Sequence, residues 1–518
     1  MPAYLHPGVY IEETPSGANV IASVSSSTAL FVGAITKGSI GEATLITQWE
    51  NYQDQFGGIL DTDTAVQGDA MGHSVSAFFQ NGGSKAYIVR LANTGFLTAT
   101  GDEQLASAIV GSAFTFNALN AGVWGDALRV QISEASGVYS LDIGTGDGAD
   151  FVSLESYSDI NVDDEADAKF LLNQINGISS LVTVSLDTEI PTPHALPTSG
   201  TTTVTLAGGD DGAAIVSGTE PAGSEPELTS YADVFSAALK LRDISIICLP
   251  GQFWNGSNSI VSAAIAHCEA IKNRMLIIDL TSTTELDDAA DVTALSLPTQ
   301  TYVATYYPWV VASNPYYNAE TNPTVPSTVL VPPCGYAAGM WAKVDSKRGI
   351  WKAPAGVGTG LLGVAGLEYT VSDDEQDFLN PAGVNALRNL PGYGSVIWGA
   401  RTLSTNVEPE WRYIPVRRTA LFIEESLYNG IQWAVFEGNN HVLWSSLRAS
   451  VEAFMNGLFR AGAFQGESTS DAYFVRCGLG DTMTQTDIDN GQVIVLVGFA
   501  PLKPAEFVIL RLQQKVGN

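Results

Sequence analysis

The chain has 518 residues, enough for about three or four domains and far above the length at which a hydrophobic core is difficult to bury. It carries 55 acidic and 24 basic residues, and the resulting formal net charge of −31 argues against a nucleic-acid partner, because affinity for phosphate comes from clustered Lys and Arg. Charged residues make up 15% and hydrophobic residues 45% of the chain, a composition that excludes disorder and indicates that much surface is hidden, in a core or against other copies.

The amino-terminal sequence and the cysteines indicate in which cellular compartment the protein is expected. Residues 1–10 contain no basic region followed by an apolar stretch, so we expect no secretory signal and a protein that is made and kept in a cytoplasm. No uninterrupted apolar run approaches the ~20 residues of a membrane span, so we expect no membrane insertion. The cysteines stand singly and are expected to be reduced and buried: Cys248, Cys268, Cys334 and Cys477.

Residues 25–94 have the pattern of a β-α-β unit. A buried strand is predicted at 28–33, a helix with one apolar face at 69–80, and a second strand at 86–91. The same alternation resumes after residue 211, with strands at 244–249 and 275–279, a helix at 259–273 and an apolar run at 302–311. Short apolar strands that alternate with amphipathic helices predict a mostly parallel sheet covered on both faces.

Residues 95–210 interrupt this pattern. They contain sixteen acidic residues and two basic ones, and runs such as 128–132 and 202–206 alternate between apolar and polar side chains as half-buried strands do. The sequence therefore predicts a small, well-solvated β domain inserted into an α/β domain.

The last 118 residues are less acidic, with twelve acidic and ten basic side chains. Helices are predicted at 416–428 and 440–460, since apolar residues recur there at three- and four-residue steps. A pair of strands is predicted at 472–478 and 491–499, and we interpret these residues as a third unit.

Motifs for chemistry are weak throughout. The five histidines are dispersed, no Gly-Lys pair exists for a phosphate-binding loop, and the G-x-G-x-x-G at 358–363 follows no predicted strand. The acidic runs 163–164 and 373–375 are interpreted as solvated faces or helix starts. We therefore predict no catalytic residues, no bound cofactor and no metal site.

The two chain ends carry extended, apolar sequences. Residues 8–13 and 506–513 each have a strand-like pattern, and each is set off from its domain by Pro residues or by a stretch rich in Gly and Ser. Such a segment is suited to pairing with the open sheet edge of another molecule. The alternative is that both ends fold back onto their own chain.

Several short motifs, taken in order, resemble one known family. They occur at 7–13 (Pro-Gly-Val-Tyr-Ile-Glu-Glu), 28–33, 56–58, 78–83, 86–90, 122–126, 206–212, 383–385, 398–402, 413–418 and 498–507. With these motifs the chain resembles, over nearly its full length, the contractile tail sheath proteins of bacteriophages and of related phage-tail-like injection systems.

The resemblance implies a fold and a domain plan. An α/β domain of Rossmann-like and subtilisin-like, non-catalytic type would comprise residues 25–94 with 211–400, interrupted by an outer β domain at 95–210. An α+β inner assembly domain would follow at 401–505, with an amino-terminal arm and linker at 1–24 and a carboxy-terminal arm at 506–518. We interpret residues 308–352, rich in Pro, Tyr and Trp, as a surface elaboration.

The resemblance also implies a function. Sheath subunits stack as hexameric rings around an inner tube and contract to drive that tube through the envelope of a target cell. The expected partners are other copies of the chain, the inner tail tube protein, and baseplate and tail terminator proteins, in a virion tail assembled in the host cytoplasm. Alternatives are the sheath of a non-viral injection particle, another self-assembling shell or surface-layer protein, and an enzyme with a degenerate hydrolase fold.

The site residues that follow from the resemblance belong to assembly rather than catalysis. The exchanged arms would contain Val9, Tyr10 and Ile11 at one end and Phe507, Val508, Ile509, Leu510, Arg511 and Leu512 at the other. The receiving strands would present Tyr473, Val475, Val493, Val495 and Val497. Contact with an acidic tube surface is a hypothesis for Arg417, Arg418, Arg448 and Arg460, with ordinary ion pairs as the alternative.

Overall fold

The structure is a computed structural model in which the chain divides into two compact units. The α/β unit comprises residues 26–347 and 353–417, and the C-terminal unit comprises residues 418–518 with 1–25 and 348–352. Within these units the structure describes residues 20–61, 69–93, 104–111, 113–135, 138–194, 196–197, 201–221, 230–282, 285–404, 407–507 and 509.

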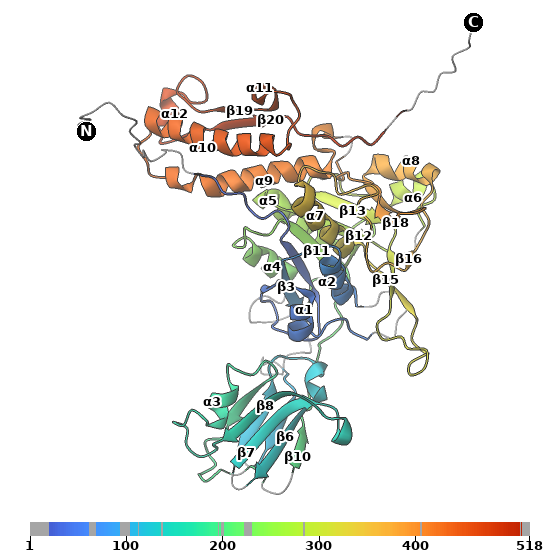
Figure 1. The fold of residues 1–518 in the computed structure, drawn as a ribbon, viewed down its shortest axis with the longest axis vertical. Coiled ribbons are helices and arrows are strands. Elements are labelled where there is room, and N and C mark those ends of the chain that lie inside the picture. The colour runs from blue at the N-terminus through green and yellow to red at the C-terminus, as the bar shows by residue number, and fades with distance from the viewer. Residues whose placement is uncertain are drawn as a thin grey trace, which may run out of the picture. The chain divides into compact units, whose positions relative to one another are not determined.

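An eight-stranded sheet forms the centre of the α/β unit (Figure 1). Neighbouring strands from β17 to β3 are parallel, while the edge strands β18 and β2 run antiparallel, so the prediction of a mostly parallel sheet is confirmed. In spatial order the strands are β18 (Gly394–Ile397), β17 (Val384–Leu390), β13 (Val303–Tyr307), β12 (Met275–Leu280), β11 (Ile246–Trp254), β1 (Ala29–Ala34), β3 (Ala86–Leu91) and β2 (Thr44–Ile46).

The helices of this unit begin with polar caps that the sequence supplies. Asp69 accepts a hydrogen bond from the Gly72 N–H at the start of α2, and Ser372 forms a capping box with Glu375 at the start of α8, which confirms that the acidic run 373–375 is a helix start. The helices are α1 (Trp49–Phe56), α2 (Ala70–Gln80), α4 (Tyr231–Ala238), α5 (Ser259–Ile271), α6 (Ala289–Ala294), α7 (Cys334–Arg348) and α8 (Asp373–Ala382), with the 3₁₀ turn η3 (Pro409–Trp411).

Helix α7 packs tightly against α2. A Cβ atom on Gly335 would lie 2.1 Å from the Ser74 carbonyl oxygen, and one on Gly339 would lie 2.5 Å from the Phe78 carbonyl oxygen. The first nine residues of α7 are buried, and Trp309 and Trp341 are among the largest fully buried side chains. The interpretation of 308–352 as a surface elaboration is therefore wrong for residues 308–312 and 329–342, most of which are buried, whereas all residues of 313–328 except Asn314 are partly or fully exposed.

The apolar run predicted at 302–311 is two strands in different sheets. Strand β13 ends at Tyr307, and β14 (Val310–Ser313) belongs to a small sheet with β15 (Thr328–Val331) and β16 (Gly366–Leu367). Pro308 separates the two strands, since proline has no N–H to donate to a ladder.

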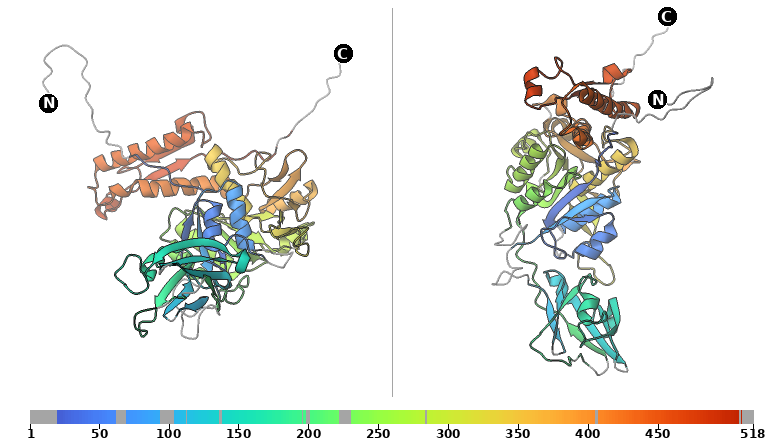
Figure 2. Two further views of the ribbon diagram at one scale, coloured as in Figure 1. Left: turned by 60° about the horizontal axis from the view of Figure 1, so that its bottom comes forward. Right: turned by 90° about the vertical axis from the view of Figure 1, so that its left-hand side faces the viewer.

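The region between β3 and α4 folds around its own hydrophobic cluster, which includes Phe114, Phe116 and Leu141. Its strands are the cyan and teal arrows of Figure 2. One sheet has the order β10-β6-β7-β8 and the other β4-β5-β9, with antiparallel pairing throughout. The elements are β4 (Ser107–Val110), β5 (Phe114–Ala118), η1 (Val123–Ala127), β6 (Leu128–Ala135), β7 (Val138–Thr145), η2 (Gly148–Asp150), β8 (Val152–Ile160), α3 (Leu171–Ile175), β9 (Val182–Leu186) and β10 (Thr201–Thr205).

Two aspartates form hydrogen bonds between the segments 122–126 and 206–212. The Val123 N–H donates to Asp211 Oδ1 and the Gly209 N–H donates to Asp126 Oδ1, each at 2.9 Å. A Cβ atom on Gly209 would lie 2.2 Å from the Gly122 carbonyl oxygen, so the two chain segments can approach this closely only if residue 209 is glycine. This accounts for the Gly and Asp residues in the motifs at 122–126 and 206–212.

The C-terminal unit is built on two long helices that carry a two-stranded sheet (Figure 1). The long helices confirm the predictions for 416–428 and 440–460 to within two residues at each end. The elements are α9 (Ile414–Gly430), whose first turn belongs to the α/β unit, η4 (Gln432–Ala434), α10 (His441–Arg460), α11 (Thr469–Ala472), β19 (Tyr473–Arg476), α12 (Gln485–Asp489) and β20 (Leu496–Phe499).

Among the described residues, no helix combines the length and hydropathy needed to cross a membrane.

Candidate functional site

The sheet formed by β19 and β20 is the candidate assembly site. Its register pairs Tyr473 with Phe499 and Val475 with Val497 in an antiparallel ladder. In the described part of the chain neither outer edge of this pair is covered by a further strand. Two strands alone are marginally stable in water, so an edge that stays open is suited to accept another strand.

One face of the sheet packs on the chain's own core. Tyr473, Val475, Val495, Val497 and Phe499 are partly buried against a cluster that includes Val451 and Met455 of α10. The predicted receiving residues therefore face the helices of their own unit, and Val493 and Val495 precede β20 rather than lying in it. Their side chains support the strands, and the groups left for a further strand are those of the backbone.

The opposite face carries apolar side chains that the sequence analysis did not name. Phe474 is 45% exposed and Leu496 is 48% exposed. Phe474 covers Gly498, where an added Cβ atom would lie 2.3 Å from the phenyl ring, and the Arg476 guanidinium lies 5.2 Å from the centre of the same ring. Because successive side chains of a strand point to opposite faces, the sequence at 473–476 could have predicted that Phe474 points away from the core.

The amino-terminal chain is anchored on the C-terminal unit. Ile21 is 7% exposed and packs against α9 at Gly430, where an added Cβ atom would lie 2.4 Å from Ile21 Cγ2. The Val24 N–H donates to Ser426 Oγ at 3.3 Å. Ile21 could not be predicted from the sequence, because a single Ile in a Ser-rich stretch gives no periodic signal. The predicted arm residues Val9, Tyr10 and Ile11 lie outside the described residues.

The described carboxy-terminal residues follow β20 in the same unit. The Ala500 N–H donates to the Ala472 carbonyl and the Gln465 N–H to the Ala500 carbonyl, so the chain is held directly after β20. Beyond that point Phe507 and Ile509 are 75% and 78% exposed. The other predicted arm residues, Val508, Leu510, Arg511 and Leu512, lie outside the described residues.

Two of the four candidate tube-facing arginines are buried. Arg417 is 6% exposed and its guanidinium lies 3.9 Å from the centre of the Tyr302 ring and 4.5 Å from that of Trp411; Arg418 is 3% exposed. Both side chains are buried within the described chain, and this burial argues against a contact with the tube. Their burial depends on residues distant in the sequence, such as Tyr302, which helix periodicity does not reveal.

The other two candidate arginines, Arg448 and Arg460, are partly or fully exposed. Arg448 is partly exposed and donates hydrogen bonds to the Cys477 carbonyl and to Ser445 Oγ. Arg460 is exposed in the last turn of α10, where a cation stabilises the helix. These two remain hypotheses for contact with a partner.

Buried polar side chains explain two of the sequence motifs. Arg90 is fully buried and donates to the carbonyls of Ile35, Gly38 and Ala121 at 2.7–2.8 Å. Asn385 of β17 is hydrogen-bonded to Arg401 in the segment after β18. Its Nδ2 donates to the Arg401 carbonyl at 2.9 Å and its Oδ1 accepts from the Arg401 N–H at 2.7 Å. These motifs hold the fold together.

Buried titratable groups also have structural roles. The Asp279 carboxylate, at the end of β12, accepts the Cys334 N–H at 3.0 Å at the start of α7, and its complete burial raises its pKa to about 7. Burial likewise raises the pKa of Asp69, the cap of α2, to about 6 and lowers the pKa of His267 to about 4. The His267 ring contacts Arg274, and the His194 ring contacts the carbonyls of Val162 and Ile190.

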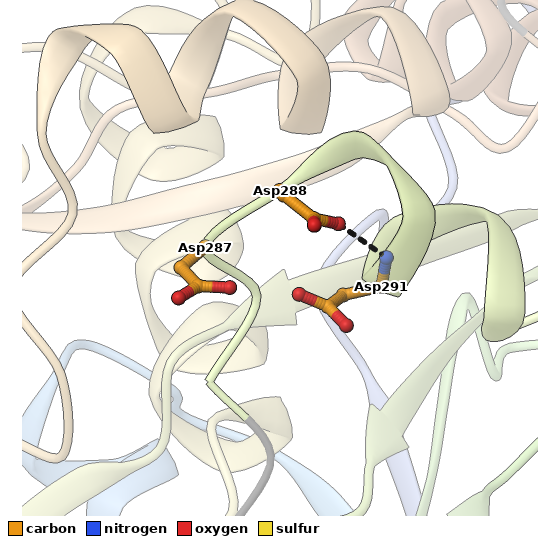
Figure 3. Close-up of side chains that lie close together, drawn as sticks. All are labelled: Asp287, Asp288 and Asp291. Atoms are coloured by element: carbon orange, nitrogen blue, oxygen red, sulfur yellow. Dashed lines mark hydrogen bonds between the residues drawn. The ribbon is translucent and has the colours of Figure 1, made fainter.

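One acidic cluster lies at the start of α6 (Figure 3). In the described parts of the chain, Asp287, Asp288 and Asp291 are the one group of acidic, His or Cys side chains close enough to share a metal ion. Asp288 Oδ1 accepts the N–H groups of Ala290 and Asp291, and a hydrogen bond with Asp287 raises the pKa of Asp291. We assign Asp288 to the capping of α6, since anions are favoured at a helix start, with Asp287 exposed and Asp291 partly exposed beside it.

Solved structures with the same fold are sheath proteins. The chain matches the contracted sheath complex of an extracellular contractile injection system (PVC) with a TM-score of 0.59 and 22% identity, covering 100% of this chain and 99% of that one. It matches the contracted helical sheath of the anti-feeding prophage with a TM-score of 0.57 and 23% identity, over 99% of this chain and 100% of that one. A sheath tail protein from Desulfitobacterium hafniense gives a TM-score of 0.59 at 14% identity, over 96% and 100%. These likenesses establish a mixed α/β fold that the chain shares with sheath proteins.

Two models of phage tail sheath domains match the sequence of this chain, in agreement with its fold. Residues 226–403 match the central domain of phage tail sheath proteins and residues 406–515 match the phage tail sheath C-terminal domain, which together span more than half of the chain. The chain belongs to the phage tail sheath family. It is also 26% identical over 182 residues to a protein of Pseudomonas aeruginosa (strain UCBPP-PA14) named as a prophage major tail sheath protein, an alignment that spans 34% of this chain and 44% of that relative.

Proposed function

We propose that this chain is the repeating subunit of a contractile sheath, which stacks as hexameric rings around an inner tube and contracts to drive the tube through the envelope of a target cell. The observation that carries the proposal is that the described residues nearest to both chain ends are held on the unit that contains the two-stranded sheet. Ile21 and Ala500 fix the two ends to this unit, and β19 and β20 offer edges that no described strand covers.

Strand exchange between subunits follows from this arrangement. An arm of about seven residues forms roughly six backbone hydrogen bonds at ~1 kcal/mol each and buries three or four large side chains at ~1.5–3 kcal/mol each. Ordering the arm costs about 1–2 kcal/mol per residue, so gains and costs nearly cancel. One exchanged arm is therefore weak, whereas a lattice in which each subunit gives and receives two arms adds many such contacts. Under this proposal subunits reorient during contraction while the exchanged strands stay paired.

The finer assignments belong to the same proposal. We assign residues 25–94 with 211–400 to an α/β domain of Rossmann-like and subtilisin-like type, residues 95–210 to an outer inserted domain, and residues 401–505 to the inner assembly domain. The proposed partners are other copies, a tube protein, and baseplate and terminator proteins of the particle tail. We propose that the subunit is not an enzyme and needs no cofactor.

The test is deletion of residues 506–518. We expect soluble, folded protein that forms no long tubes in negative-stain microscopy, whereas the intact chain forms hollow cylinders. Normal cylinders from the truncated protein would overturn strand exchange, and flat nets from the intact protein would favour a surface layer instead.

A second candidate is the sheath of a non-viral injection particle. The likeness to sheaths of an extracellular contractile injection system favours it. The genes beside this one distinguish the two, since a capsid gene indicates a virus.

A further inference from the structure

Phe436 is an exposed aromatic residue in an unusual backbone conformation. It lies between η4 and α10, its relative exposure is 104%, the highest among the exposed large hydrophobic residues that the structure describes, and its φ angle is 71°. A positive φ is costly for an aromatic residue, and an exposed phenyl ring is unfavourable in water. Neither property contributes to the stability of the single chain.

The surrounding loop holds Phe436 in this position. The Val435 N–H donates to the Gln432 carbonyl and the Glu437 N–H to the Ala434 carbonyl. Asn439 then bridges two further groups, because its Oδ1 accepts from Trp444 Nε1 at 2.8 Å and its Nδ2 donates to the Gln492 carbonyl at 3.0 Å. Strained residues that the neighbouring structure fixes in this way are concentrated at binding sites.

The α/β unit contains an open apolar pocket. It lies between α4, strands β1 and β3, and residues 40–43, and its volume is about 290 Å³. Leu30 and Val89 are fully buried at its base, and Ile40, Ala237 and Leu241 are partly exposed at its rim. A pocket of this size and lining suits one large apolar side chain.

The charges beside the ring and the pocket restrict how the ring can enter. Glu437 is exposed directly after Phe436, Lys240 is exposed directly before Leu241 of the pocket rim, and the exposed Glu42 lines the pocket itself. Glu437 is therefore attracted to the Lys240 side of the pocket and repelled from the Glu42 side. Opposite charges around an apolar contact fix its orientation and disfavour other partners.

We propose that Phe436 of one subunit inserts into this pocket on a second copy of the chain, with Glu437 beside Lys240. The inference rests on the proposed function, since it adds a contact to the same sheath. Because the ring and the pocket are different surfaces, the contact joins copies head to tail and extends into a helical array, unlike a closed pairing of identical surfaces. The bound ring would recover the cost of its exposure in the free chain.

Disulfide trapping tests the partner directly. The four native cysteines are buried, so a chain carrying Phe436→Cys and Ala237→Cys presents two accessible thiols. Cylinders are confirmed by microscopy first and then oxidised. We expect a ladder of linked chains on a denaturing, non-reducing gel, and only dimers when separate single-cysteine variants are mixed and assembled. Cylinders without linked chains, or a link within one chain, overturn the proposal and leave the sheath function standing.

Replacement by glycine separates assembly from folding. Phe436→Gly removes the ring and suits a positive φ, so the thermal midpoint of the monomer stays the same or rises. We expect the concentration needed for cylinder formation to rise about tenfold, as for an interface hot spot. Lys272→Gly, at another exposed residue with positive φ (55°), is the matched control and leaves assembly unchanged. Normal sheath assembly by Phe436→Gly, with or without loss of tube binding, overturns the proposal.

A charge exchange tests the orientation of the contact. Glu437→Lys and Lys240→Glu each raise the assembly concentration about two- to fivefold at low salt, and the double variant returns it toward the original value. Additive losses in the double variant contradict the pairing of these two residues.

Discussion

The two sheets of this protein differ in how completely the chain covers them. All six residues of β12 are buried, and its neighbours β11 and β13 are buried along almost their whole length. In contrast, β19 and β20 contain no fully buried residue. Partly buried and exposed residues alternate along β19, and in β20 one exposed residue is followed by three partly buried ones. The α/β sheet is complete within one chain, whereas the C-terminal sheet has an open face and open edges in the described residues.

This difference indicates where the free energy of each part comes from. A parallel sheet between helices gains its stability from apolar burial within the chain. A two-stranded sheet with one covered face gains little, and its remaining stabilisation comes from what binds to it. Substitutions in the first sheet should therefore affect folding, and substitutions in the second should affect assembly.

The largest expected effect is in the α/β core. Trp341 is fully buried and donates from Nε1 to the Tyr306 hydroxyl at 2.7 Å. Trp341→Ala should lower the free energy of unfolding by about 3–5 kcal/mol, because it leaves a cavity and removes a hydrogen bond to the Tyr306 hydroxyl. Urea denaturation followed by circular dichroism measures the change.

The matched variant is Phe474→Ala on the open face of the C-terminal sheet. Since Phe474 is 45% exposed, its loss should change the free energy of unfolding by about 1 kcal/mol or less. Equal destabilisation by the two variants would mean that the C-terminal sheet is as self-sufficient as the α/β sheet.

The second prediction concerns pH. Asp279 normally titrates near 3.8, and burial raises its pKa to about 7, so the folded chain keeps a proton that the unfolded chain releases. Between pH 4 and 7 the unfolded state binds fewer protons, and the free energy of unfolding contributed by Asp279 falls as pH rises. Asp279→Asn keeps an oxygen for the Cys334 N–H and carries no titrating proton.

The stability of Asp279→Asn relative to the original chain should therefore increase from pH 5.5 to pH 7.5. Urea denaturation midpoints at the two values test this. Asp373→Asn, at an exposed helix start, is the control and should show no such increase. A constant difference between Asp279→Asn and the original chain would show that Asp279 is ionised in the folded state throughout this range.

Much of the fold could be predicted from the sequence because it depends on local patterns. The strands at 28–33 and 86–91 and the helix at 69–80 occur within one or two residues of their predicted bounds. Helix α7 was missed because nine buried residues in succession leave no apolar and polar faces to distinguish. Its packing depends on Gly335 and Gly339 meeting α2, a contact between residues about 260 positions apart.

The candidate site was less predictable. The strand pair follows from the apolar runs at 472–478 and 491–499, but the direction of each side chain depends on where the strands begin, and β20 begins five residues later than its predicted run. The arginines of α9 could be placed on a helix, yet only the fold brings Tyr302 and Trp411 against Arg417. The predicted arms remain a prediction for most of their residues.

The most local expected effect concerns the anchor of the amino-terminal chain, which links the C-terminal sheet to its proposed arm. Ile21→Ala removes a side chain that is 7% exposed and packs at Gly430, and should weaken this attachment by about 2 kcal/mol. The adjacent Val20→Ala, at a residue that is 92% exposed, is the matched control. Limited proteolysis of the monomer should cleave near residue 20 faster in Ile21→Ala alone, while the urea midpoint of the α/β unit stays the same. Because the arm would then leave its subunit from a less defined point, cylinders of Ile21→Ala should form at a higher concentration; equal cleavage in both variants would remove Ile21 as the anchor.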